Sequence, residues 1–343
     1  MNYSERRLPL AHLPTPLHET PRLRDALGGP ARCPKLLFKR DDLTGLALGG
    51  NKARKLEFLI ADALGERATV IVTTGAAQSN HARMTAAAAR AAGLEIVLVL
   101  TADDDPPVQG NLLLDHLFGA TIHFVPPPAD PLLATSDIEE AKVAEVMADL
   151  HRRGERPYLI PVGGSSGVGV LGYVFGTGEI VRQLQEMDAH PSRLYYASGS
   201  RGTQAGLTLG AAVHAAPYEL RGIAVSGGET WKRERALRIA NEAASLIGTP
   251  TRIRDSDLVT DQRQIGAGYG IPTEECLEAI SLVARSEGIL LDPVYTAKAM
   301  AGLISDVRGR AVDPQSSVLF LHTGGVPAVF AHAAMLNPAI HLY

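Results

Sequence analysis

The sequence alternates short runs of apolar, β-branched residues with longer segments that are rich in alanine and leucine. The short runs have the length of buried strands, and the longer segments have the length of helices. Such alternation indicates βαβ units, in which parallel strands form an open sheet covered by helices and sites gather at the carboxyl ends of strands. The predicted strands cover 69–74, 95–100, 121–125, 158–162, 194–197, 220–226 and 317–322, and the predicted helices cover 81–92, 136–153, 170–187, 203–215, 230–247 and 273–287.

The length and charge of the chain limit the classes of function. Its 343 residues allow one large or two medium domains, and we predict a smaller domain at 51–159 inserted into a larger one built from 1–50 and 160–343. A net charge of -4 provides no overall field that would attract nucleic acid or an anionic membrane. No run is suited to a secretory signal or a membrane span. We therefore expect a cytoplasmic protein that acts on a small molecule.

Cysteine and histidine usage argues against disulfides and metal chemistry. Cys33 and Cys276 stand far apart in the chain, and the 11 histidines are scattered without the spacing of a metal site. A disulfide framework or a zinc site needs closely spaced ligands. We expect two structural thiols and no metal.

A lysine follows two glycines at the start of a predicted amphipathic helix, in the sequence Gly49-Gly50-Asn51-Lys52. Glycine lets the backbone approach a ligand closely, and a helix start supplies free N–H groups and a positive dipole end. This environment lowers the pKa of an amine and attracts anions. Lys52 is therefore a candidate to form a Schiff base, although most lysines near helix starts are simply solvated. Lys55 lies one turn further along, where it could neutralise a phosphate.

Polar residues follow two of the predicted strands at turns that lead into helices. After the strand at 69–74 come Gln78, Ser79, Asn80 and His81. One of these would suffice as a helix cap, and four in succession indicate a site where a substrate carboxylate binds. The turn after the strand at 194–197 suits a phosphate cradle and a structural turn equally well. It contains Ser198, Gly199, Ser200, Arg201, Gly202 and Thr203.

The pattern GxGxxG also occurs, at 167–172. In a dinucleotide-binding fold the first glycine directly ends a strand, whereas here the residues 163–166 intervene. We interpret this segment as loop and helix packing. A dinucleotide-dependent oxidoreductase or a non-catalytic binding protein is the alternative from another class, and Lys52 argues against both.

Three later segments place tyrosines and threonines in predicted loops after apolar runs. They contain Tyr269, Tyr295, Thr296 and Thr323. Each of these residues alone is more typical of a core or a turn. A functional role for these residues is indicated only in combination with the segments around Lys52 and Ser79.

Together, these segments resemble the D-cysteine desulfhydrase and 1-aminocyclopropane-1-carboxylate deaminase family of fold-type II, tryptophan-synthase-like enzymes. The resemblance runs from 13–17 to 320–325 and covers nearly the whole chain. It rests on Gly-Gly-Asn-Lys with Arg-Lys-Leu-Glu-Phe at 49–58, Gln-Ser-Asn-His at 78–81 and Leu-Asp-Pro-Val-Tyr-Thr at 291–296.

The resemblance implies an α/β fold of two open twisted parallel sheets flanked by helices, the cofactor pyridoxal 5'-phosphate, and a homodimer. It implies that Lys52 carries the cofactor and that Asn80 hydrogen-bonds its ring hydroxyl. The phosphate would be bound by Lys55 and by Ser198, Gly199, Ser200, Arg201, Gly202 and Thr203. The substrate would be bound by Gln78, Ser79 and Asn80, with Tyr269 and Tyr295 against the reacting atoms, and Thr296 and Thr323 would contact the cofactor.

The two threonines distinguish branches of this family. The deaminases have Glu after the second tyrosine and Leu before the final Gly-Gly, whereas this chain has Thr296 and Thr323. A carboxylate near the pyridine nitrogen strengthens the ring as an electron sink, and a hydroxyl does not. The pattern therefore favours loss of a good β-leaving group, with D-cysteine giving pyruvate, ammonia and hydrogen sulfide, over ring opening of 1-aminocyclopropane-1-carboxylate.

Three positions depart from the family. Arg201 stands where relatives usually have a small residue, Gln204 where many have His, and Ala297 where Gly is usual. The Arg201 guanidinium could face solvent, pair with the phosphate, or accept a more anionic substrate such as L-cysteate. L-Cysteate sulfo-lyase activity is therefore an alternative to D-cysteine elimination.

Overall fold

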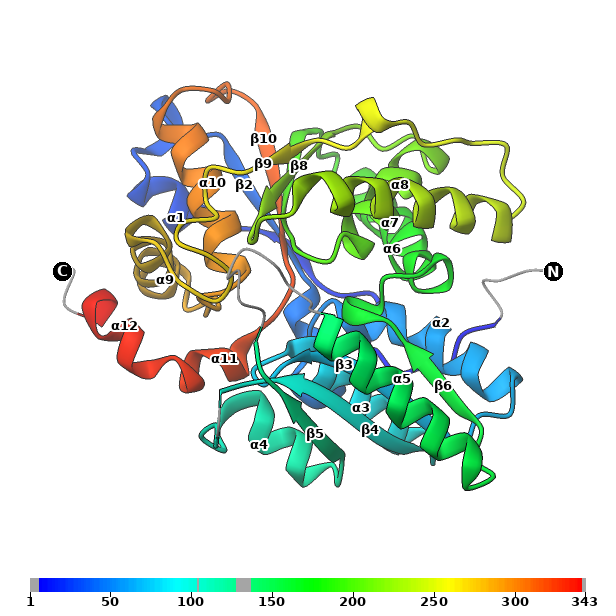
Figure 1. Cartoon of the computed structure of the whole chain (residues 1–343). Helices are drawn as coiled ribbons and strands as arrows, with labels where there is room; N and C mark the ends of the chain where they lie inside the picture. Colours follow the sequence, from blue (N-terminus) through cyan, green and yellow to red (C-terminus); the bar gives the residue numbers. More distant parts are fainter. Residues whose placement is uncertain (1–5, 104, 128–136, 341–343) are drawn as a thin grey trace.

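The computed structural model describes residues 6–103, 105–127 and 137–340. Two sheets, each flanked by helices, form the upper and lower halves of the molecule in Figure 1. The larger sheet has the strand order β1-β2-β10-β7-β8-β9, and the smaller has the order β5-β4-β3-β6. The larger sheet contains β1 (Leu17–Glu19), β2 (Lys35–Arg40), β7 (Pro191–Ser198), β8 (Glu219–Ala224), β9 (Thr260–Asp261) and β10 (Ser317–His322), and the smaller contains β3 (Val70–Ala76), β4 (Glu95–Thr101), β5 (Thr121–Val125) and β6 (Pro157–Ile160).

All seven predicted strands are present, within a few residues of their predicted bounds. The prediction of two parallel sheets flanked by helices is confirmed, and the one antiparallel pair among the described strands is at an edge, where β1 pairs with β2. Three strands were not predicted: β2, whose apolar centre is flanked by charged residues, and β1 and β9, which are very short. The strands of the smaller sheet lie between residues 70 and 160, and the boundary of an inserted domain at 51–159 stays a prediction.

The six predicted helices are also present, although Ser136, the predicted start of one of them, lies outside the described residues. None of the described helices is long and apolar enough to cross a bilayer. Tyr295 and Thr296, expected in a loop, instead begin a helix. The helices are α1 (Pro21–Ala26), α2 (Lys52–Gly65), α3 (Asn80–Ala91), α4 (Gly110–Leu117), α5 (Asp137–Arg152), α6 (Gly167–Glu186), α7 (Gly202–Val213), α8 (Glu229–Leu246), α9 (Glu274–Glu287), α10 (Thr296–Arg308), α11 (Val326–Ala331) and α12 (Ala333–Ile340).

Small residues let the helices approach their neighbours closely. Helix α3 buries a row of alanines, and β3 is buried along nearly all of its length. The GxGxxG segment lies inside α6, where a Cβ at Gly172 would collide with the Arg54 carbonyl of α2. The interpretation of this segment as helix packing agrees with the close contact between α2 and α6.

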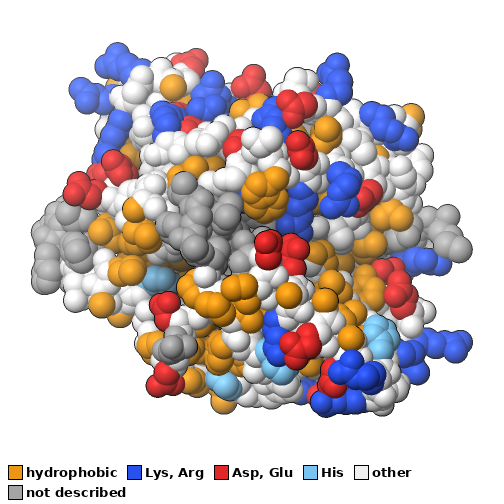
Figure 2. Space-filling view, in the orientation of Figure 1, with side chains coloured by type: hydrophobic (Ala, Val, Ile, Leu, Met, Phe, Trp, Pro, Cys, Tyr) orange, Lys and Arg blue, Asp and Glu red, His pale blue; other side chains and the backbone are white. Residues whose placement is uncertain are grey.

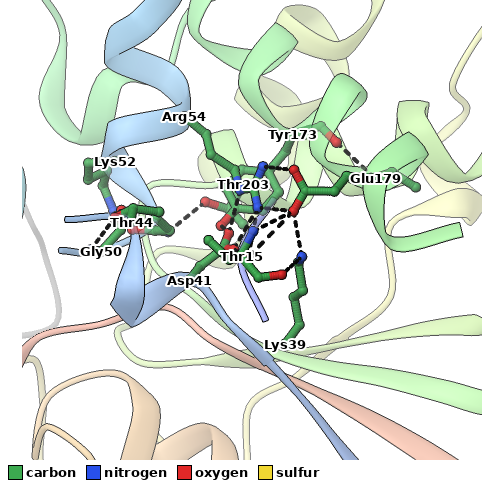
Figure 3. Close-up of polar contacts among 12 residues, drawn as sticks. Thr15, Lys39, Asp41, Thr44, Gly50, Lys52, Arg54, Tyr173, Glu179 and Thr203 are labelled. Carbon is green, nitrogen blue, oxygen red and sulfur yellow. Dashed lines mark hydrogen bonds and ion pairs between the residues drawn. The ribbon is translucent and has the colours of Figure 1, made fainter. Parts of the chain in front are cut away.

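A buried network of charged side chains connects α2 to α6 and to the turn after β2 (Figure 3). The Arg54 guanidinium donates to Asp41 Oδ2 at 2.7 Å and to Glu179 Oε1 at 2.8 Å. Lys39 Nζ donates to the same Glu179 oxygen at 2.5 Å, and Tyr173 donates to Asp41 at 2.5 Å. Each charge in the network therefore has an opposite charge within hydrogen-bonding distance.

Mutual compensation keeps these buried groups ionised. Burial alone would raise the pKa of Asp41, but Arg54 and Lys39 lower it to about 2. Burial likewise opposes the charged form of Glu179, and Arg54 and Lys39 hold its pKa below the usual value. Removing one member of such a network leaves its partners buried without compensation.

We expect Glu179→Gln to destabilise the fold by about 3 kcal/mol, because it leaves the charges of Lys39 and Arg54 short of a counter-charge. Glu186→Gln is the matched control, since Glu186 lies on the same helix in an exposed pair with Arg182 and should change stability by about 0.5 kcal/mol or less. Urea unfolding monitored by circular dichroism measures both. Equal midpoints for the two variants would contradict a stabilising role of the network.

Candidate functional site

A cavity of about 580 Å³ is lined by residues at the carboxyl ends of strands from both sheets. Its walls include Ser79 after β3, Ser198 at the end of β7 with Gly199 and Ser200 after it, Ser226 after β8 and Thr323 after β10. The volume is typical of a small-molecule site. The place of the cavity agrees with the rule that parallel sheets bind ligands at the carboxyl ends of their strands.

Lys52 begins α2 and lines this cavity. Its Nζ donates to Asn51 Oδ1 at 3.0 Å. Burial lowers the pKa of Lys52 to about 8, and the positive charge of Arg83 contributes to this lowering against the opposing effect of Asp292. About a tenth of the amine is therefore neutral, and nucleophilic, at pH 7, far more than for a solvated lysine.

Asn51 holds together three segments that surround Lys52. Its side chain donates to Thr203 Oγ1 at 3.0 Å, and its backbone N–H donates to the Thr323 carbonyl at 3.0 Å. The preceding Gly50 has a φ of +134°, and the approach of Gly324 is so close that a Cβ on Gly324 would lie 2.6 Å from the Gly50 Cα. This tight turn requires glycine because a side chain would displace the neighbouring strand end.

The turn after β3 presents Ser79 and Asn80 to the cavity. Ser79 caps α3, because its Oγ accepts a hydrogen bond from Ala82 N at 3.1 Å, which leaves the hydroxyl hydrogen available to a ligand. Asn80 Oδ1 accepts from Asn111 Nδ2 at 3.0 Å. Since that acceptor is in use, the amide NH₂ of Asn80 is the part that a ligand can contact.

Arg83, which was not predicted as a site residue, also lines the cavity and is fully buried. Its guanidinium donates to Gly49 O at 3.2 Å and to Asn80 Oδ1 at 3.4 Å, and it also bonds Ala47 O. It therefore joins the turn before Lys52 to the turn after β3. The signal in the sequence was its position one helical turn after Asn80.

The segment from Ser198 to Thr203 wraps the amino-terminal end of α7. Ser200 Oγ accepts from Ser165 Oγ at 2.9 Å. A Cβ on Gly202 would lie 2.8 Å from Lys55 Nζ, so this amine lies directly beside the segment. Free backbone N–H groups at a helix start, together with hydroxyls and an amine, form a suitable site for a phosphate.

Arg201 does not face solvent, because it is 2% exposed. Its backbone has the left-handed φ of +69°, and its guanidinium pairs with Glu229 and donates to Ser198 Oγ at 2.8 Å. It also donates to Gln204 Oε1 at 2.9 Å. The guanidinium is thus held by protein groups. The third residue that departs from the family, Ala297, is buried in α10.

Two tyrosines meet at the opposite wall. The hydroxyl oxygens of Tyr269 and Tyr295 are 2.5 Å apart. Burial raises the pKa of both phenols, so both are neutral near neutral pH. Asp292 holds this wall in place by accepting from the backbone N–H of Tyr295 at 2.9 Å and from Thr296 Oγ1 at 2.6 Å.

Four expected site residues do not line the cavity. Gln78 is used by α4 instead, because its Oε1 accepts from Asn111 N at 2.9 Å. The Thr296 hydroxyl is engaged with Asp292. Lys55 and Gly202 lie just behind the segment 198–203, with Lys55 Nζ donating to Gly163 O at 3.0 Å. Lys52, Ser79, Asn80, Ser198, Gly199, Ser200, Arg201, Thr203, Tyr269, Tyr295 and Thr323 do line it.

Two basic residues of α8, Lys232 and Arg235, line the cavity and were also missed. Their spacing of three residues after a strand and a short turn was the available signal. Among the described lining residues, Asp103 is the one carboxylate. No three His, Cys, Asp or Glu side chains in the described ranges are grouped to hold a metal ion.

The residues present fit pyridoxal phosphate. The amine of Lys52 can react with a carbonyl carbon, the segment 198–203 with Lys55 suits a phosphate, and the amide of Asn80 can donate to a ring oxygen. The Thr323 hydroxyl lines the cavity and has no hydrogen-bond partner among the residues that the structure describes. It can therefore bond a ring nitrogen.

Comparison with known proteins agrees with this geometry. The family model for pyridoxal-phosphate dependent enzymes matches residues 8–324. D-Cysteine desulfhydrase of Salmonella typhi is 41% identical over 331 residues, which cover 95% of this chain and 96% of the relative. The crystal structure of an ACC deaminase homologue has a TM-score of 0.85 at 36% identity and covers 97% of this chain and 96% of its own.

A more distant structure shares the fold. A threonine deaminase has a TM-score of 0.60 at 20% identity, covering 91% of this chain and 92% of its own. The described sheets and helices are thus those of a fold-type II enzyme. The chain belongs to the family of pyridoxal-phosphate dependent enzymes.

Proposed function

We propose that this protein is a carbon-sulfur lyase that converts D-cysteine to pyruvate, ammonia and hydrogen sulfide with pyridoxal 5'-phosphate. The observation that carries the proposal is Lys52, a cavity-lining amine whose pKa is lowered to about 8 at the start of α2. The name and near full-length match of D-cysteine desulfhydrase support the choice of substrate.

When bound, pyridoxal phosphate would supply the electron withdrawal that makes the substrate Cα proton acidic. Lys52 would hold the cofactor, and its amine in the neutral form would accept the Cα proton. Asn80 binds the ring hydroxyl through its amide NH₂, and Ser198, Gly199, Ser200, Arg201, Gly202 and Thr203 bind the phosphate with Lys55.

Ser79 binds the substrate carboxylate. Its hydroxyl hydrogen is free, and it stands at the start of α3, where the positive end of the helix dipole attracts an anion. Tyr269 and Tyr295 face the reacting atoms, and their shared hydrogen bond at 2.5 Å lets one phenol donate a proton to the leaving thiolate while the other supports it. Gln78 and Thr296 are left out of the contacting residues, because Asn111 N donates to Gln78 Oε1 and the Thr296 hydroxyl is bonded to Asp292.

The surroundings of the ring nitrogen favour elimination over ring opening. The Thr323 hydroxyl is available to this nitrogen, and the one described carboxylate in the lining, Asp103, is exposed. A hydroxyl does not keep the nitrogen protonated, so the ring is a weaker electron sink. A substrate with a good β-leaving group needs less electron withdrawal by the ring than a cyclopropane substrate does.

L-Cysteate is the less supported substrate. Its sulfonate would need a cation beside the substrate, and Arg201 was the candidate from the sequence. The Arg201 guanidinium is already bound by Glu229, Ser198 and Gln204, so a sulfonate would have to compete with the Glu229 carboxylate for its charge, although the buried Nε–H has no partner among the described residues.

We also propose a homodimer in the cytoplasm. Exposed apolar side chains gather on α4, α11 and α12, at the lower left of Figures 1 and 2, as a dimer interface would require. Both cysteines are free and buried, which suits a reducing compartment. The exposed members of the apolar surface are Leu113, Leu117, Phe330 and Met335.

We expect Lys52→Ala to abolish the visible absorption band of the bound cofactor and to reduce pyruvate release from D-cysteine by about a thousandfold or more, because both the attachment and the proton acceptor are lost. Lys142→Ala, which changes a partly exposed lysine on α5 outside the cavity lining, should keep both. Full turnover by Lys52→Ala would refute the proposed role.

Substrate choice is tested by assaying pyruvate release from D-cysteine, L-cysteine and L-cysteate in parallel, with 2-oxobutyrate measured for 1-aminocyclopropane-1-carboxylate. We expect D-cysteine to have the highest kcat/KM. A higher value for L-cysteate or the cyclopropane would replace the proposed reaction by that one.

The pH at which the cofactor-free protein captures pyridoxal phosphate should depend on Arg83. Capture needs the neutral amine, so it rises with pH through the pKa of Lys52, near 8. Arg83→Gln removes a positive charge that disfavours the ammonium form, and the midpoint should move to higher pH. Arg83→Lys should keep the midpoint close to that of the native protein, and an unchanged midpoint in Arg83→Gln would exclude the electrostatic role of Arg83.

A further inference from the structure

One end of the cavity carries more positive charge than its described protein partners neutralise. Lys55, Lys232 and Arg235 all lie at this end, and no carboxylate of the described residues is within 4.0 Å of any of them. The nearby Glu229 pairs with Arg201 instead. Buried or half-buried cations without a carboxylate partner indicate that an anion belongs among them.

Lys232 is fully buried with part of its donor capacity unused. Its Nζ donates to Ser226 Oγ at 2.7 Å and to the Gly227 carbonyl. An ammonium group has three N–H donors, so one remains for a ligand. Because Lys232 lines the cavity, that donor is available there.

Arg235 lies one helical turn further along α8 and is joined to the segment 198–203 through a single residue. Its guanidinium donates to Ser165 O at 3.3 Å, and Ser165 Oγ donates to Ser200 Oγ at 2.9 Å. The bond to Ser165 O is the one hydrogen bond of the Arg235 guanidinium within the described part of the chain, and a guanidinium has five N–H donors. Arg235 therefore has ample donor capacity at the phosphate-suited end of the cavity.

The cations at this end also repel one another. Burial lowers the pKa of Lys55 well below its usual value, and the charges of Lys52 and Arg235 lower it further. Burial lowers the pKa of Lys232 to about 8, with Arg201 and Arg235 adding to the effect and Glu229 opposing it. A phosphate, which carries a charge of about -2 near neutral pH, would relieve this repulsion.

We propose that Lys232 and Arg235 of α8 bind the cofactor phosphate together with Lys55 and the segment 198–203. This inference rests on the proposed function, and it assigns to α8 a part in holding the cofactor. A Cβ on Gly202 would lie 2.5 Å from Ser165 Oγ, so Ser165, whose carbonyl accepts from Arg235, lies directly against the segment 198–203.

The test compares pyridoxal 5'-phosphate with pyridoxal, which lacks the phosphate, in titrations of the cofactor-free full-length protein followed by absorbance. Lys232→Met and Arg235→Met should each raise the Kd for pyridoxal phosphate by about tenfold or more, as expected for a lost charge-assisted hydrogen bond. Both variants should bind pyridoxal as the native protein does. Arg238→Met is the control, because Arg238 lies on the same helix in an exposed pair with Glu242 and should change neither Kd.

Inorganic phosphate provides a second measurement that does not depend on Lys52. It should compete with pyridoxal phosphate in the native protein and compete less well in both α8 variants. An unchanged Kd for pyridoxal phosphate, or an equal loss for pyridoxal in a variant with a native urea midpoint, would overturn the inference. Failure of the proposed reaction is a separate result, since it would appear as absent D-cysteine turnover in a native protein that still binds the cofactor.

Discussion

The buried contact of Arg54 with Asp41 and Glu179 fixes the position of the helix on which the site depends. Arg54 lies between Lys52 and Lys55 on α2, and its partners come from the turn after β2 and from α6. A buried guanidinium with two carboxylates allows little change in geometry, because any displacement leaves a charge uncompensated in a medium of low dielectric. The start of α2 is thereby held at the junction of the two sheets, with Lys52 lining the cavity and Lys55 directly behind the segment 198–203.

Positive charges at two places around the cavity have two different effects: one favours the neutral form of the Lys52 amine, and the other attracts an anion. Arg83 lies beside Lys52 and disfavours its ammonium form, which keeps a nucleophile available, while Lys232 and Arg235 lie at the end beside Ser165. Asp103 is the one carboxylate in the described lining, so an anionic ligand meets attraction from Lys232 and Arg235 at one end and from Lys52 and Arg83 elsewhere. The same low dielectric that depresses the pKa of an unpaired lysine strengthens its interaction with a bound anion.

Residues on the turns that follow strands could be predicted from the sequence, because the βαβ pattern fixes where strand ends meet. Ser79 and Ser198 are examples. The side-chain direction of Gln78 and Thr296 could not be predicted, since it depends on hydrogen bonds to Asn111 and Asp292 that form only in the tertiary fold. Lys232 was missed for a related reason: a charged residue on a helix is expected to be solvated until the rotation of that helix against the sheet is known.

The position of β10 in the larger sheet has a consequence for how the chain folds during synthesis. This strand pairs with β2 on one side and β7 on the other, although it begins at residue 317. Until β10 leaves the ribosome, the edges of β2 and β7 that pair with it have no partner strand, and unpaired strand edges promote aggregation. The smaller sheet, whose strands all precede residue 161, can assemble early, whereas the larger sheet must wait for the last strand. Chaperone demand should therefore be concentrated on the larger sheet.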